Sequence, residues 1–280
     1  MRHKPMLAYP VSDKPINYDD KVFMQPKLDG VRCLIQYDKK TGVTAWSRTG
    51  KQWKNIHHIT SSLEQWFKSN QTTVLDGELY NHDLRDDFET IISLVRRQDP
   101  DDIDMIESRD LVQFHCYDII HPDNSTFEDR NRFVRCCVPE TNYVKHVHTM
   151  QISSHKNALT FHESYKAGGY EGSILRTNDV YHQKRTHSLR KFKDFHDTEA
   201  TITSWVEGKG KRVGTIGKFM AVDADGNEFG MPVMDNFKYL QDNFKAMQGY
   251  VGKTATFTYF ERTKAGSYSH PLFKCIRDYE

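Results

Sequence analysis

The sequence lacks any long apolar run and any surplus of charge of one sign. No segment approaches the roughly 20 consecutive apolar residues that a membrane-spanning helix needs, so we expect no membrane partner. Residues 1–10 lack the apolar stretch of a secretory signal, which favours a cytoplasmic protein. Lys and Arg number 39 against 38 Asp and Glu, so net charge gives no direct evidence for a nucleic-acid partner. Any basic surface must be local.

Cysteine is scarce and follows no spacing pattern. The five cysteines are odd in number and form no CxxC pair, which argues against a disulfide framework or a zinc ribbon and favours reduced thiols. The 14 histidines are scattered and form no HExxH pair, so solvated or hydrogen-bonded histidines are favoured over metal ligands. The composition, 37% hydrophobic and 28% charged, is typical of a soluble globular protein.

What the sequence does contain is a regular succession of strand and helix patterns. Helical spacing of apolar residues is found at 63–67 and 88–95, and a further predicted helix runs over 154–166. Predicted strands cover residues 31–37, 43–48, 72–79, 111–119, 143–152, 171–177 and 188–194. The first two are joined by a five-residue polar connection that ends in Gly42, which predicts an antiparallel hairpin.

The pattern changes at about residue 199. Short β-segments separated by turns follow, with one helix-like stretch at 234–247, and this texture predicts a small barrel or sandwich. A length of 280 residues fits two domains of ordinary size. We therefore place the boundary near residues 196–199 and expect domains at 1–197 and 198–280.

One short segment combines an amine, a carboxylate and a guanidinium around a glycine. It is Lys27-Leu28-Asp29-Gly30-Val31-Arg32, immediately before a predicted strand. A lysine acts as a covalent nucleophile only when its pKa, ordinarily about 10.4, is lowered by burial or by nearby cations. Taken alone, the six residues are better explained by a surface Lys–Asp pair beside a turn.

Five further segments favour a functional interpretation of the Lys27 segment, because all six follow one another in a fixed order. The later segments are Ser47-Arg48-Thr49-Gly50, Leu75-Asp76-Gly77-Glu78-Leu79, Phe114-His115-Cys116-Tyr117-Asp118, Glu171-Gly172-Ser173-Ile174-Leu175-Arg176 and Lys191-Phe192-Lys193. Together they resemble the ordered elements of the covalent nucleotidyltransferase superfamily of DNA ligases, RNA ligases and mRNA capping enzymes. The resemblance covers the whole first domain.

The resemblance implies a fold and a reaction. The expected fold class is α+β: a nucleotidyltransferase (adenylation) domain with antiparallel sheets and flanking helices, followed by an OB-fold β-barrel domain. The expected reaction has three steps, in which Lys27 takes AMP from ATP, AMP passes to the 5′-phosphate of a nick, and the 3′-hydroxyl displaces AMP. Each step is a metal-assisted transfer at phosphorus.

The resemblance also implies roles for the polar residues of the first domain. Lys191 and Lys193 would contact the α-phosphate, and their period-two spacing directs both side chains to one face of a strand. Glu78 would bind the ribose. Glu171 would help to hold Mg²⁺ or Mn²⁺, with Asp29 as a second metal candidate and a catalytic residue for activation of the 3′-hydroxyl.

Aromatic and guanidinium side chains complete the expected nucleotide site. Phe114 is our choice for stacking on adenine, with Tyr117 as the alternate and a plain core aromatic as the competing interpretation of either. Arg32 and Arg48, expected on paired strands, would contact AMP and the 5′-phosphate of the nick. Arg176 and Arg185 are weaker candidates, and an ordinary surface ion pair competes for Arg176.

The second domain offers a basic turn and a terminal arginine. Lys209, Lys211 and Arg212 lie in a segment that resembles the OB domain of small DNA ligases and would meet DNA phosphates. A flexible basic turn is an equally good account of these three residues. Arg277 stands where the family has its last element, which orients the pyrophosphate leaving group, although the lysine that often follows is absent.

The choice among relatives favours a small ATP-dependent DNA ligase. An NAD-dependent ligase needs a further N-terminal domain, and only 26 residues precede Lys27. A capping enzyme would use GTP, and an RNA ligase is the alternative function. A catalytically silent nucleic-acid-binding protein would not need Lys27, Glu171, Lys191 and Lys193 together. We therefore expect a monomer that acts on nicked duplex DNA in replication, repair or recombination, in a bacterial cell or a virus-infected host cell.

Overall fold

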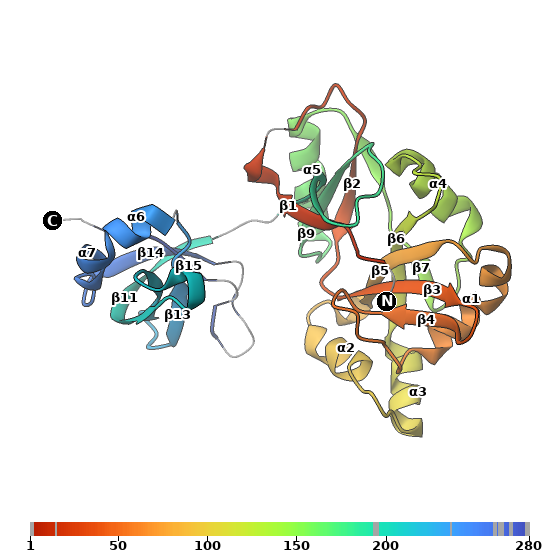
Figure 1. Ribbon diagram of the computed structural model, residues 1–280, viewed down its shortest axis with the longest axis horizontal. Helices are drawn as coiled ribbons and strands as arrows, with labels where there is room; N and C mark the ends of the chain where they lie inside the picture. The colour runs from red at the N-terminus through yellow and green to blue at the C-terminus, as the bar shows by residue number, and fades with distance from the viewer. Residues whose placement is uncertain are drawn as a thin grey trace. The chain divides into compact units, whose positions relative to one another are not determined.

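The computed structural model describes residues 3–14, 16–192, 196–235, 237–259, 262, 266–268 and 271–277. The chain divides into two compact units, Met1–Lys193 and Asp194–Glu280. Both units combine a sheet or sheets with helices (Figure 1). Each unit is considered separately below.

The described residues of the first unit form ten strands in two five-stranded sheets. The β2 sheet has the order β1-β10-β9-β2-β8, and the β5 sheet has the order β4-β3-β5-β6-β7. The β2 sheet consists of β1 (Leu7–Pro10), β2 (Val22–Lys27), β8 (Met150–Ile152), β9 (Gly172–Thr177) and β10 (Arg185–Phe192). The β5 sheet consists of β3 (Val31–Asp38), β4 (Gly42–Trp46), β5 (Val74–Tyr80), β6 (Gln113–Ile120) and β7 (Val144–His146).

The described part of the first unit also has five α-helices. They are α1 (His57–Ser69), α2 (Phe88–Val95), α3 (Asp102–Leu111), α4 (Phe127–Cys137) and α5 (His155–Ala167), and two short 3-10 turns lie at Val11–Asp13 and His82–Leu84. Leu63 of α1, Ile91 of α2 and Val134 of α4 enter one buried cluster with β5-sheet residues, while α5 lies on the β2 sheet (Figure 1). Apolar residues at helical spacing place one face of α1, α4 and α5 against a sheet, whereas α3 packs on α1 and α2.

In its described residues, the second unit has one antiparallel sheet and two short helices. Its strands, in the order β13-β12-β11-β14-β15, are β11 (His196–Glu207), β12 (Ile216–Val222), β13 (Glu228–Pro232), β14 (Thr254–Tyr259) and β15 (Leu272–Ile276). A 3-10 turn lies at Gly210–Arg212, and the helices are α6 (Phe237–Asp242) and α7 (Phe244–Gln248). Within the described residues no strand pairing closes this sheet into a barrel.

Several sequence predictions are confirmed and several are corrected. The helices α2 and α5 fall within a residue of their predicted bounds, and the hairpin of β3 and β4 is present. The strand predicted over residues 143–152 is wrong, because β7 and β8 are separate strands in different sheets. The helix predicted at 234–247 is two short helices, and α3 and α4 had no counterpart among the predictions.

Within the described ranges, no helix is both long enough and apolar enough to cross a membrane.

Candidate nucleotide and nucleic-acid site

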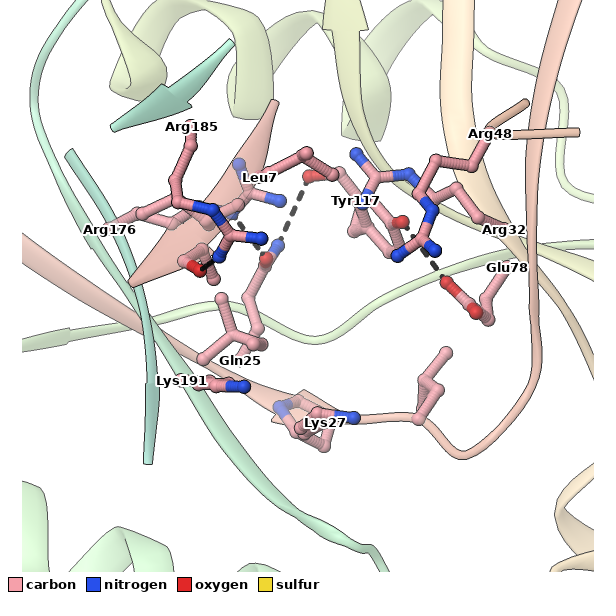
Figure 2. Close-up of a pocket in the computed structure, with 15 residues that line it drawn as sticks. Leu7, Gln25, Lys27, Arg32, Arg48, Glu78, Tyr117, Arg176, Arg185 and Lys191 are labelled. Carbon is pink, nitrogen blue, oxygen red and sulfur yellow. Dashed lines mark hydrogen bonds between the residues drawn. The ribbon is translucent and has the colours of Figure 1, made fainter. Parts of the chain in front are cut away.

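A pocket lies where the two sheets of the first unit face one another. Its lining comes from β1, β2, β9 and β10 of the β2 sheet, from β3, β5 and β6 of the β5 sheet and from the turn after β4 (Figure 2). The cavity measures about 260 Å³, near the lower end of the roughly 300–1,000 Å³ that is common for small-molecule sites. It is lined by Leu7, Ala8, Gln25, Pro26, Lys27, Leu28, Arg32, Arg48, Glu78, Tyr117, Ile174, Arg176, Arg185, Leu189 and Lys191.

Strand pairing brings Lys27 to Glu171, which is 144 positions away in the sequence. Lys27 ends β2 and is the antiparallel partner of Gly172 in β9, so Glu171 stands beside it. The Lys27 amine and the Glu171 carboxylate form an ion pair, with the carboxylate side chain only 6% exposed and the lysine side chain 21% exposed. This pair must open before the lysine nitrogen can attack an electrophile.

The turn that follows Lys27 explains the glycine of its segment. A β-carbon at Gly30 would lie 2.4 Å from the backbone oxygen of Leu79 and 2.7 Å from Cγ of Glu78. Only glycine therefore allows the chain to pass this close to β5. The same close approach sets Arg32 directly opposite Glu78 in the pairing of β3 with β5.

The buried carboxylate of Asp76 holds Arg32 in position. Its Nε and one terminal nitrogen donate to the two oxygens of Asp76, both at 2.6 Å, and the same terminal nitrogen donates to the Met6 carbonyl at 3.2 Å. Asp76 also accepts a 2.6 Å hydrogen bond from the Tyr181 hydroxyl. A forked arrangement of this kind fixes the plane of the guanidinium group.

Arg176 is held in the same way by a second buried carboxylate. It donates to Asp118 at 2.7 Å and to the side-chain oxygen of Gln25 at 2.7 Å. Asp118 is fully buried and also accepts two hydrogen bonds from Arg130, at 2.7 and 3.2 Å. Asp76 and Asp118 both lie in quoted sequence motifs, yet sequence reasoning assigned them no role. The sequence signal for a role was a carboxylate within an apolar strand, because burying a carboxylate without a partner costs free energy.

Glu78 is the carboxylate that lines the pocket. Its Oε2 accepts a 3.1 Å hydrogen bond from the Tyr117 hydroxyl, drawn as a dashed line in Figure 2. Burial raises the pKa of Glu78 to about 7, and Arg32 and the Tyr117 hydroxyl act in the opposite direction. Burial also raises the pKa of Tyr117 well above its ordinary value, so this phenol remains a hydrogen-bond donor.

Phe114, our choice for stacking on adenine, lies in the core rather than in the pocket lining. Phe114 is 0% exposed and belongs to the core cluster of the β5 sheet, where its ring would meet a β-carbon at Gly77 at 2.5 Å. Tyr117, the alternate, lines the pocket. The two residues are three positions apart on β6, and side chains an odd number of positions apart point to opposite faces of a strand.

Three more of the predicted site residues line the pocket. Arg48 lines the pocket but lies in a turn after β4, so its expected place on a strand is wrong. Lys191 lines the pocket from β10, and Arg185 does so from the start of the same strand. Lys193 lies outside the described residues. Asp29 follows Leu28 in the turn between β2 and β3 and is not part of the pocket lining.

Four of the predicted residues belong to the second unit. Lys209 precedes the 3-10 turn Gly210–Arg212, which contains Lys211 and Arg212. This turn is held in place, because Arg212 donates to the Val233 carbonyl at 3.0 Å and Thr215 donates to the Arg212 carbonyl at 2.7 Å. Arg277 forms an ion pair with Glu199 of β11.

The side chains of the pocket fit a nucleotide. Cationic groups of Lys27, Arg32, Arg48, Arg176, Arg185 and Lys191 suit phosphate oxygens, and the aliphatic residues suit a base. Among the described residues, no group of three or more His, Cys, Asp or Glu side chains could hold a metal ion. A divalent ion that fits is therefore one bound by a single carboxylate such as Glu171 together with phosphate and water oxygens, as Mg²⁺ commonly is.

Comparison with known families gives the decisive observation. Residues 5–193 match the model of the ATP dependent DNA ligase domain. The chain belongs to the ATP-dependent DNA ligase family. Among relatives of this chain is a DNA ligase of African swine fever virus, 25% identical over 205 residues that make up 69% of this chain and 46% of the viral protein. The chain thus spans about half the length of the curated relatives it matches.

Solved ligase structures have the same fold. A Lig E DNA ligase, described as binding DNA with a minimal scaffold, has a TM-score of 0.76 and 23% identity, with 99% of this chain and 100% of that chain covered. The ATP-dependent DNA ligase of bacteriophage T7, solved in complex with ATP, has a TM-score of 0.56 and 18% identity, with 98% of both chains covered. At these identities the likeness shows the fold alone.

Proposed function

We propose that this protein is an ATP-dependent DNA ligase that seals nicks between 3′-hydroxyl and 5′-phosphate ends of duplex DNA. One observation carries the proposal: a lysine amine stands in a pocket whose cations Arg48 and Lys191 have no carboxylate within ion-pair distance among the described residues. Cations left without a carboxylate at a pocket suit an anionic ligand. Family membership makes ATP the source of that ligand, and DNA-ligase relatives disfavour an RNA ligase.

The first step is nucleophilic attack by Lys27. After its ion pair with Glu171 opens and it loses a proton, the nitrogen forms a bond to the α-phosphorus of ATP, and the bond from that phosphorus to the pyrophosphate oxygen breaks. Lys191, and Lys193 from outside the described residues, would stabilise the charge on the α-phosphate oxygens. A divalent cation such as Mg²⁺, held by Glu171 and assisted by Asp29, would neutralise phosphate charge.

The remaining groups of the pocket orient the nucleoside. Glu78 would accept hydrogen bonds from the ribose hydroxyls, and Tyr117 positions that carboxylate through its own hydroxyl. Tyr117 also replaces Phe114 as the proposed aromatic wall. In the later steps an oxygen of the nick 5′-phosphate attacks the lysyl-bound AMP and frees Lys27. The 3′-hydroxyl then attacks that 5′-phosphate, AMP leaves, and Arg32 and Arg48 would contact the reacting phosphates.

The second unit would supply nucleic-acid contacts and help in the first step. We propose that residues 198–280 form an OB-fold domain, in which Lys209, Lys211 and Arg212 meet DNA phosphates. Arg277 would orient the pyrophosphate leaving group, and this role requires that its ion pair with Glu199 be broken. We propose further that the protein acts as a monomer on nicked duplex DNA.

The test combines nucleotide choice with substrate choice. The protein is incubated with labelled ATP or GTP and Mg²⁺, and then with nicked DNA, nicked RNA or hybrids. We expect a covalent AMP adduct from ATP and sealing of nicked DNA. Lys27→Ala should form no adduct by mass spectrometry but should still seal a nick that already carries AMP, because the amine is used only in the first step.

The matched control is Lys39→Ala, a change of an exposed lysine in the turn between β3 and β4. This variant should form the adduct in full yield. An unchanged adduct yield in Lys27→Ala would remove Lys27 from the proposed mechanism. A preference for nicked RNA would favour the alternative function.

A further inference from the structure

The helix α3, labelled in Figure 1, buries polar side chains and exposes apolar ones. Its buried residues are Asp104 and Ser108, whereas Ile103, Met105 and Ile106 are 68%, 41% and 50% exposed. A helix at the surface of a globular protein ordinarily has the opposite distribution. Among the described residues of the first unit, three of the four exposed large apolar side chains lie on α3.

Hydrogen bonds to the bend before α1 hold α3 in this orientation. The Ser108 hydroxyl donates to the Asn55 carbonyl. The side-chain amide of Asn55 donates to the carbonyls of Leu94 and Asp104, at 3.1 Å each. The Asp104 carboxylate also pairs with Arg97 at 2.7 Å. The helix can turn its apolar side inward only by breaking these contacts, several of which are buried.

A groove lies between α3 and the start of α1. It measures about 450 Å³, within the roughly 300–1,000 Å³ that is common for binding sites. Four of its lining residues come from α3 at the spacing i, i+3, i+4 and i+7, which places them on one face of the helix. They are Asp102, Met105, Ile106 and Arg109. The groove and the nucleotide pocket have no lining residue in common.

Asn55 gives this groove a buried hydrogen-bond acceptor that has no partner. The residue is 1% exposed, and its amide nitrogen faces two carbonyl oxygens, which can only accept. Its side-chain oxygen therefore points elsewhere, and no donor among the described residues reaches it. An unpartnered buried acceptor costs free energy. A ligand in the groove that donates one hydrogen bond to this oxygen removes that cost.

The surface around the groove is acidic. Residues 101–111 contain five acidic side chains and one basic side chain, a net charge of −4. The basic one, Arg109, is paired with Asp110 at 3.0 Å. Asp102 and Glu107 are exposed, and within the described ranges no cation lies at ion-pair distance from either. This charge repels nucleic acid and attracts Lys and Arg side chains.

We infer that the groove binds an extended segment of a partner protein, with an aliphatic or aromatic side chain against Met105 and Ile106 and a Lys or Arg beside it. Exposed apolar side chains at a concave surface are typical of such interfaces. The face from Asp102 to Arg109 is roughly 10 Å long at about 1.5 Å per residue. That length suits about three extended residues at about 3.3 Å each. An extended segment also has main-chain N–H groups available for Asn55, whereas a helix uses its own.

The experiment selects peptides from a phage-displayed library of random dodecapeptides on the full chain. We expect the enriched peptides to share an apolar residue next to Lys or Arg. Synthetic copies, measured by fluorescence anisotropy, should bind Ile106→Ser roughly tenfold or more weakly than wild type, because a central apolar contact is lost. Met105→Ser is the second variant and should act in the same direction. Enriched peptides that are acidic would overturn the inference.

The matched control is Leu159→Ser, which changes an exposed apolar side chain of α5, 40% exposed, outside the groove. This variant should bind the peptides with wild-type affinity. Equal weakening in Leu159→Ser and Ile106→Ser would overturn the inference, because the effect would then be one of general surface hydrophobicity. Unfolding curves show whether each variant folds, and substitutions at exposed positions of this kind seldom destabilise a protein.

A second pair of variants tests the charge. Asp102→Asn with Glu107→Gln should weaken peptide binding about fivefold at low salt, and the difference from wild type should shrink as salt screens the remaining charges. The control, Asp19→Asn with Asp20→Asn, makes the same change of charge at exposed residues outside the groove and should have little effect. Equal effects of the two double variants would contradict charge recognition at the groove.

Two further measurements test the hydrogen bond and the identity of the occupant. Replacing each main-chain amide of an enriched peptide by an ester should weaken binding at one position by several-fold, up to about tenfold, because an ester offers Asn55 no donor. Equal affinity for every ester would overturn this hydrogen bond. Sedimentation velocity tests a second copy of the chain as the occupant. A dimer that Ile106→Ser dissociates would overturn the assignment to a different protein.

The groove and the proposed function are tested apart, because peptide binding is measured without nucleotide or DNA. If the wild-type protein forms the AMP adduct and seals nicks, but no enriched peptide depends on Met105 or Ile106, only the groove assignment fails. If enriched peptides bind as expected but no adduct forms from ATP, only the proposed function fails.

Discussion

Two groups of cationic side chains line the pocket, and they differ in whether a carboxylate is paired with them. In the first group, Arg32 is paired with Asp76 and Arg176 with Asp118, and both carboxylates are fully buried. In the second group, Arg48 and Lys191 have no carboxylate within ion-pair distance in the described ranges. A paired, buried guanidinium fixes the framework, whereas an unpaired cation beside a cavity has its hydrogen-bond donors available to a ligand. The buried carboxylates thus hold Arg32 and Arg176 in position, while the donors of Arg48 and Lys191 are available to a ligand.

Removing a buried carboxylate should have the largest effect on this comparison. Asp118→Ala leaves Arg130 and Arg176 buried without their anion, and breaking a buried pair costs about 3–5 kcal/mol. We therefore expect a loss of this size in the free energy of unfolding, measured by urea denaturation. Asp110→Ala, which breaks the exposed pair with Arg109, should cost less than about 1 kcal/mol. Equal losses would refute the distinction drawn here.

Phe114 and Tyr117 of β6 extend the comparison from charged to aromatic side chains. Phe114→Leu shrinks a core side chain and leaves a cavity, and a large-to-small core substitution of this kind costs on the order of 1–2 kcal/mol. It should lower the free energy of unfolding and leave the dissociation constant for ATP unchanged. Tyr117→Leu should instead weaken ATP binding, because its ring lines the pocket and its hydroxyl holds Glu78. Isothermal titration calorimetry measures the dissociation constant for ATP in both variants. Weaker binding by Phe114→Leu would restore Phe114 as the residue that stacks on adenine.

Glu78 tests the comparison through the pH dependence of stability. Its pKa in the folded protein is about 7, above the ordinary value of 4.5. The protonated form is thus favoured by folding, and its contribution is fully present below about pH 4.5 and is lost as pH rises through 7. The difference in the free energy of unfolding between the wild type and Glu78→Gln should therefore decrease as the pH rises from about 5 to about 7. A pH-independent difference would show that the pKa of this carboxylate is not raised.

The sequence predicted local elements better than it predicted their partners. The hairpin of β3 and β4 and the helices α2 and α5 depend on contacts between residues close in the chain, so spacing and turn residues identify them. The helix α3 was not predicted because most of its surface is exposed, with Ile103 at 68% and Ile106 at 50%, which weakens any apolar stripe. The break between β7 and β8 depends on which sheet each strand joins, and a single strand pattern does not encode that.

The candidate site was predicted in part for the same reason. Lys27, Arg32, Glu78 and Lys191 line one pocket, as the ordered motifs suggested. The choice of Phe114 over Tyr117 could not be made without knowing which face of β6 meets the core. The roles of Asp76 and Asp118 were missed because their partners lie 44 and 58 positions away.

By itself the sequence determined the order of the six motifs, the change of pattern near residue 199 and hence the family expectation. Only the tertiary structure decided that Lys27 meets Glu171 and that Tyr117 lines the pocket. The physical reason is that motifs arise from local spacing, whereas a site is made by strand register and by the pairing of charges from distant segments. Burial then sets which of those charges are fixed and which are available to a ligand.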